Sequence, residues 1–140
     1  MANELDTLVD NVAALLDEIS QYKQIHRNEP DVISTSCEAA ILVDIGTQGQ
    51  YGVQQHEEKH TLRIRSYIVV GADIKYPEQL TRQLLNLQVD KFNQHVNLDG
   101  GAEISNLSNY RTGYLNIAGV LCRILDTFLE ATIVVNTPYA

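Results

Sequence analysis

Residues 61–96 read TLRIRSYIVVGADIKYPEQLTRQLLNLQVDKFNQHV, and this stretch decides the fold. Residues 61–70 alternate in polarity, which predicts a half-buried strand, because successive side chains of a strand point to opposite faces. The apolar face comprises Leu62, Ile64, Ile68 and Val70, and the other face comprises Arg63, Arg65 and Tyr67. Pro77 and Glu78 then mark a helix start, since proline suits the first helical position and an acid suits the first turn.

Apolar residues recur at three- and four-residue spacings from Leu80 to Val96, which predicts a helix of about 20 residues with a broad apolar face. A half-buried strand followed at once by a long amphipathic helix is the core of a small α+β domain. We therefore expect a single α+β domain over residues 1–140. Its small mixed or antiparallel sheet should pack against this long helix and a second, N-terminal amphipathic helix.

The other segments complete a predicted order α-β-β-α-β-β. Residues 1–30 should form the N-terminal helix, over 3–26, and a loop, while residues 37–136 form the sheet-and-helix core. The remaining predicted segments are a buried strand at 37–45, an exposed Gly- and Gln-rich hairpin loop at 46–60, a weak strand at 103–109, a turn at 111–113, an irregular extended segment at 115–125 and a final strand at 127–135.

The net charge of −8 is concentrated at the N-terminal end, where residues 1–44 hold nine acids against two bases, Lys23 and Arg27. An acidic surface repels phosphate backbones, and no cluster of Lys and Arg offsets this effect. The chain also lacks Trp, and an aromatic content of 6% argues against a base-stacking platform. Tight DNA binding is therefore disfavoured, whereas passage of DNA past the surface is not.

The N-terminal residues and the apolar runs predict a soluble protein with an intracellular place of synthesis. The first residues, MANE, lack the basic and apolar regions of a secretory signal. The longest apolar runs, near 39–43 and 68–72, are far too short to span a membrane. Cys37 and Cys122 stand alone in apolar surroundings, which predicts buried free thiols in a reducing compartment.

One catalytic signature is present, because residues 56–60 read HEEKH and match H-E-x-x-H. On a helix this spacing brings His56 and His60 to one face to bind Zn²⁺, with Glu57 activating a water. The context predicts a charged, solvated loop instead, because glycines and glutamines precede the motif and a strand follows it. No phosphate-binding glycine pattern or nucleophile–base signature occurs elsewhere. We expect no enzyme activity, no cofactor and no metal.

Several charged residues are candidates for contacts between copies of the chain. Arg63, Arg65 and Tyr67 lie on the polar face of the predicted central strand, where arginines could pair with carboxylates of an adjacent copy. A plain solvent-facing strand is the alternative. The acids Asp10, Asp17 and Glu18 lie off the apolar stripe of the first helix, and they form either a partner-facing surface or a simply solvated one.

The order of these elements, with the chain end FLEATIVV at residues 128–135, resembles the tail terminator (tail completion) proteins of long-tailed bacteriophages. The resemblance covers most of the chain, and it rests on the order of the predicted elements and on their local sequence patterns. It implies a small α+β subunit of a six-membered ring, synthesised in the host cytoplasm and located in the neck and tail of the virion. Such a ring caps the tail tube, ends its polymerisation and joins it to the head-side connector, while DNA passes through its channel without specific binding.

The same resemblance implies where the partners would bind. A closed ring requires one surface to meet a different one, here the acidic N-terminal part against Arg63, Arg65, Arg82, Arg111 or Arg123 of the neighbour. The predicted loop and the chain end at 136–140 could order on docking to the tube or the connector. The loop residues expected to take part are Gly49, Gln50, Tyr51, Gln54 and His56.

Two alternatives stay open at this point. Another neck, tail-tube or adaptor subunit has similar proportions, and it would differ by polymerising into long tubes or by binding a disordered segment of a partner. A small zinc hydrolase that uses His56, Glu57 and His60 is the least favoured alternative.

Overall fold

A computed structural model of the chain describes residues 4–43, 48–49, 55–71, 76–98, 102 and 104–136. The elements along the chain are α1 (Glu4–Asp17), β1 (Gln24–His26), β2 (Cys37–Val43), β3 (Gln48–Gly49), β4 (Gln55–Val69), α2 (Pro77–Gln94), β5 (Ile104–Ile117) and β6 (Val120–Asn136). The prediction of an α+β fold with a mixed sheet and two helices is confirmed. The predicted order is wrong in detail, because it lacks β1 and β3.

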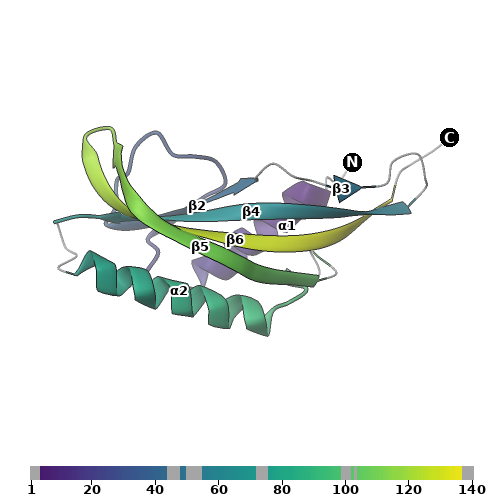
Figure 1. Ribbon diagram of the computed structural model, residues 1–140. Helices are drawn as coiled ribbons and strands as arrows, with labels where there is room; N and C mark the ends of the chain where they lie inside the picture. The colour runs from purple at the N-terminus through teal and green to yellow at the C-terminus, as the bar shows by residue number, and fades with distance from the viewer. Residues whose placement is uncertain are drawn as a thin grey trace.

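The described strands form one sheet in the order β1-β2-β4-β6-β5, with β3 paired to β4 beside this path. β1 runs parallel to β2, and every other pair is antiparallel. The long strands β4 and β6 pair over their whole shared length, from Gln55 opposite Asn136 to Val69 opposite Cys122. Figure 1 shows α2 on one side of this long, twisted sheet, and α1 packs on the same face, because side chains of both helices join one apolar cluster with Leu62, Ile64 and Ile68 of β4.

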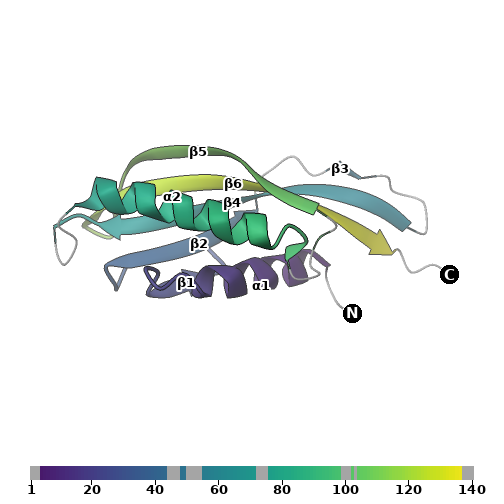
Figure 2. The same ribbon diagram turned by 90° about the horizontal axis from the view of Figure 1, so that it is seen from below.

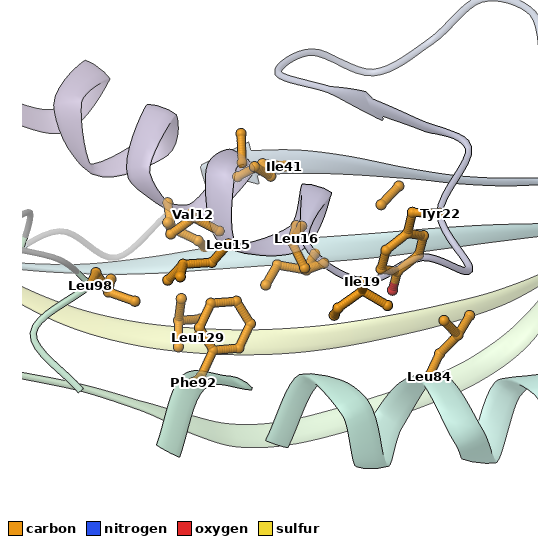
Figure 3. Packing of buried hydrophobic residues seen from close by; sticks show 14 of the residues in the cluster. Val12, Leu15, Leu16, Ile19, Tyr22, Ile41, Leu84, Phe92, Leu98 and Leu129 are labelled. Carbon is orange, nitrogen blue, oxygen red and sulfur yellow. The ribbon is translucent and has the colours of Figure 1, made fainter. Parts of the chain in front are cut away.

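The main core fills the space between the helices and the sheet. In Figure 2, α2 lies across the middle of the sheet and α1 lies alongside it, next to β1 and β2. Figure 3 shows Leu84 and Phe92 of α2 and Leu15 and Leu16 of α1 directed into one apolar cluster with Leu129 of β6. Burial of each such side chain contributes about 1.5–3 kcal/mol, so this cluster supplies most of the driving force for folding.

The central strand and the following helix agree with the sequence pattern. Leu62, Ile64 and Ile68 of β4 are buried in the main core, as their alternation predicted, whereas Val70 lies just past the strand and is exposed. Helix α2 begins at Pro77 and carries an acid in its first turn, also as predicted.

The opposite face of the sheet is partly covered by residues 27–36, which we call the strap. In Figure 1 the strap arches over the sheet on the side away from the helices. Its Ile33 packs on Ala40, Tyr67, Cys122 and Ile124 in a second, smaller apolar cluster. Cys37 and Cys122 are both free and buried, as expected, although they lie in different clusters.

The first helix is shorter than the predicted range 3–26, because α1 ends at Asp17. The Glu18 amide donates to the Leu15 carbonyl at 3.2 Å, three residues back, which tightens and closes the last turn. The Lys23 amide then donates to the Cys37 carbonyl, which brings β1 beside β2. The apolar stripe misled the prediction because it continues through Tyr22, a residue that packs in the core without being helical.

The predicted turn at 111–113 is also wrong, since Gly113 lies within β5 and pairs with Ile124. The chain turns at Ala118 and Gly119, both with positive φ (50° and 86°), between the paired residues Ile117 and Val120. Two central residues with positive φ are typical of a type I′ hairpin. The segment predicted as irregular, 115–125, is therefore the end of a regular hairpin.

The predicted exposed loop at 46–60 contains more strand than expected. Residues 55–60 belong to β4, and Gln48 and Gly49 of β3 pair with Lys59 and Glu58. Its docking candidate Gly49 is thus part of a strand, and so is the backbone of His56. The other candidates, Gln50, Tyr51 and Gln54, lie outside the described residues.

Candidate interaction surfaces

The H-E-x-x-H motif lies in strand β4 and not in a helix. His56 is opposite Val135 and His60 is opposite Ala131 in the ladder with β6. Positions four apart along a strand are separated by about 13 Å, whereas two ligands of one zinc ion each lie about 2 Å from the metal. The backbone of β4 therefore does not bring these two positions together. Within the part of the chain that the structure describes, no group of three or more His, Cys, Asp or Glu side chains could hold a metal.

Arg65 is used within its own chain. Its Nε donates to Asp126 Oδ1 at 2.8 Å and its Nη2 donates to Oδ2 at 3.1 Å, while Nη1 lies 4.0 Å from Glu29 Oε1. This two-pronged bond to Asp126 raises the pKa of the guanidinium further. A carboxylate of an adjacent copy would have to compete with Asp126, so Arg65 is a weaker interface candidate than the sequence suggested.

A stacked group lies beside this pair on the same face of the sheet. The Phe128 ring of β6 is flanked by the guanidinium carbons of Arg63 and Arg111, at 5.4 Å and 5.3 Å from its centroid. Such contacts contribute about 0.5–1 kcal/mol each at exposed sites. The neighbouring candidate Tyr67 has no exposed area, because the strap and β6 cover it. Burial raises the pKa of its hydroxyl, and the prediction that Tyr67 lines an open surface is wrong.

The acidic candidates of the N-terminal region are exposed. Asp10 Oδ1 accepts from Arg27 Nε at 2.7 Å, and Glu18 Oε1 accepts from Lys91 Nζ at 3.4 Å, which links the end of α1 to α2. Asp17 is exposed, and Arg82 of α2 lies 4.0 Å from Glu78 one turn before it. Exposed pairs of this kind contribute about 0–1 kcal/mol to stability. Charged groups of a partner could therefore replace these pairs with little loss of stability.

A groove opens at the edge of the sheet where β1 stops. β1 pairs only with Glu38–Ala40, so it does not cover the outer edge of β2 from Ile41 to Val43. The groove there has a volume of about 630 Å³, and its lining comes from α1, the start of the strap and the end of β2. The lining residues are Asp6, Val9, Asp10, Arg27, Asn28, Glu29, Ile41, Leu42 and Val43.

The other edge of the sheet is the 14-residue strand β5. Among the described strands it pairs with β6 alone, so its outer backbone groups face away from the sheet. Large apolar side chains are exposed around the end of the β5–β6 hairpin, at Tyr110, Tyr114, Leu115 and Leu121. Sequence reasoning missed this edge and the groove, because both depend on which strands become neighbours.

No protein-family model matches the chain, and no curated protein sequence matches it either. Within the described residues, no helix is long and apolar enough to cross a membrane.

Proposed function

We propose that the protein is a structural subunit that joins copies of itself into a closed ring. The ring is of the kind that caps the tail tube of a long-tailed bacteriophage, ends its polymerisation and joins it to the head-side connector. One observation carries the proposal: among the strands that the structure describes, the long outer edge of β5 pairs with no neighbour, in a sheet whose two helices pack on a single face.

A bare edge strand is a template for another chain, because it presents a row of unpaired N–H and C=O groups. Protected edges are short, strongly charged or irregular. β5 has one irregularity, between Leu107 and Asn109, and one charged side chain, Arg111. One irregularity and one charge give a 14-residue edge strand little protection against pairing with another chain. An edge of this length is therefore more consistent with pairing between subunits than with a monomer.

The distribution of charge supports a contact between unlike surfaces. Residues 1–44 are strongly acidic, whereas residues 104–125 contain Arg111 and Arg123 and no acid. A contact between two different surfaces repeats from copy to copy, and it closes into a ring when the rotation per copy divides a full turn. The same edge would also suit a tube subunit, which differs by continuing into long polymers.

Electron microscopy of the purified chain mixed with tail-tube rings tests this function. We expect closed rings that bind to one end of a tube and stop its elongation. A matched mixture containing an unrelated acidic protein of the same size should leave elongation unchanged. Tubes that elongate at the same rate with and without the chain, or long tubes built from the chain itself, would contradict the proposed role.

A further inference from the structure

We propose that the groove at the open edge of β2 receives the end of the β5–β6 hairpin, residues 110–123, of a second copy of this chain. The inference rests on the proposed self-assembly and names the two surfaces that meet. It is carried by the complementary chemistry of the groove and the hairpin and by their positions at different ends of the sheet.

The groove offers an acidic rim around an apolar floor. The lining holds three carboxylates, of Asp6, Asp10 and Glu29, and one guanidinium, of Arg27, so it keeps a net negative charge. Asp10 accepts from Arg27 Nε at 2.7 Å, and Glu29 Oε1 lies 4.0 Å from Arg65 Nη1 of β4. The floor is formed by Val9 and by the last residues of β2, where Val43 is 46% exposed. A fitting occupant combines positive charge with large apolar side chains.

The hairpin end of the same chain has this combination. Nine large apolar side chains are exposed in the described part of the chain, and four of them are Tyr110, Tyr114, Leu115 and Leu121. Their only charged neighbours within residues 110–123 are Arg111 and Arg123. The Arg123 guanidinium carbon lies 4.8 Å from the Tyr114 ring centroid, so charge and ring are presented together. By strand alternation and pairing, Tyr110, Tyr114 and Leu121 lie on one face of the hairpin, and Arg111 and Leu115 lie on the other. The hairpin end therefore presents apolar groups on both faces, which suits a segment that enters a groove, and exposed apolar patches mark interaction sites.

The hairpin of one copy does not reach the groove of that same copy. In the sheet, Cys122 of the hairpin lies beside Val69, which is level with the Cys37 end of β2, whereas the groove lies at the Val43 end. Figure 1 likewise shows the β5–β6 turn at the end of the sheet away from the start of α1. The contact is therefore head-to-tail, and repeating it generates the ring of the proposed function.

The test uses two charge reversals, Asp6→Lys in the groove and Arg111→Glu in the hairpin, in the full-length chain. Each variant alone juxtaposes like charges and should weaken assembly by at least about tenfold, as followed by sedimentation velocity. An equimolar mixture of the two variants should assemble like the wild type. When the two variants alternate, each reversed groove meets a reversed hairpin and each unchanged groove meets an unchanged hairpin, so every contact again joins opposite charges.

Lys59→Glu on β4 is the matched control, because it reverses an exposed basic residue outside both surfaces. It should assemble normally. The interface is overturned if Arg111→Glu assembles like the wild type, if Lys59→Glu impairs assembly as much, or if the mixture fails as its components do. Rescue by mixing also excludes misfolding, since unfolded copies do not complement each other. A wild-type chain that stays monomeric overturns the proposed function as well. If the wild type assembles and the charge-reversal variants assemble equally well, only this interface is overturned.

Discussion

At the scale of single residues, Glu38 is the side chain that holds the strap to the sheet. Its carboxylate is fully buried on β2. Oε1 lies 2.6 Å from His26 Nε2, and Oε2 accepts from the Ser34 amide at 2.9 Å and from the amide and hydroxyl of Thr35, both at 2.7 Å. Burial alone would raise the pKa of this carboxyl, but the hydrogen bonds from His26, Thr35 and Ser34 outweigh it and lower the pKa.

A pKa that is lower in the folded state than in the unfolded chain stabilises the fold above the unfolded pKa of about 4.3. That contribution disappears as the pH falls through the lower, folded value. Glu38→Gln should therefore reduce the free energy of unfolding at pH 7 by about 1.5–3 kcal/mol. The free energy of unfolding of the variant should also fall less steeply than that of the wild type as the pH is lowered. Urea denaturation at pH 7 and at pH 4 measures both effects.

The exposed acid Glu18 provides the comparison, because Glu18→Gln removes only a surface pair with Lys91. That change should alter the free energy of unfolding by less than about 1 kcal/mol at either pH. An unchanged acid dependence in Glu38→Gln would show that this carboxyl does not hold the strap.

At the scale of elements, a buried polar network ties α2 to the sheet and to the turn after α1. Gln88 Nε2 donates to Tyr22 Oη at 2.5 Å, and Thr127 Oγ1 donates to Gln88 Oε1 at 2.5 Å. Tyr22 Oη also lies within hydrogen-bonding distance of Ser66 Oγ. Burial raises the pKa of Tyr22 well above its usual value, so its hydroxyl stays protonated. All four residues are buried, and Thr127 Oγ1 also lies 3.3 Å from the Ile64 carbonyl oxygen.

Gln88→Ala should destabilise the protein by about 2–4 kcal/mol, because it removes two buried hydrogen bonds, to the hydroxyls of Tyr22 and Thr127, and opens a cavity. Thermal unfolding followed by circular dichroism measures this loss. Gln83→Ala, on the exposed side of the same helix, is the control and should change stability by less than about 0.5 kcal/mol. Equal losses in the two variants would mean that the network adds nothing beyond helix propensity.

Elements were predictable from the sequence where the periodicity is local and strong, as in β4 and α2. The β5–β6 turn was missed because it uses Ala118-Gly119, without the Asn-Gly or Asp-Gly pair that signals a type I′ turn. The end of α1 was missed because the apolar stripe continues through Ile19 and Tyr22, which are buried in the core although the helix ends at Asp17. The pairing of Arg65 with Asp126 was out of reach, since 61 positions separate them and only the sheet register joins them.

At the scale of the whole molecule, the proposed ring depends on a one-sided sheet whose two edges differ and, among the described strands, are incompletely paired. One edge is the bare strand β5 and the other is the acidic groove beside β2. Each surface alone has ordinary explanations, such as a solvated strand or a surface hollow. Together they give one subunit two complementary contacts, which is what a closed ring requires of each of its copies.

The most direct test of this account is the mass of the purified wild-type chain in solution, measured by native mass spectrometry over a range of concentrations. We expect one dominant closed species containing a fixed number of copies, six by resemblance to tail terminators, that persists on dilution. A monomer at every concentration, or an open-ended series of sizes that grows with concentration, would contradict the closed ring.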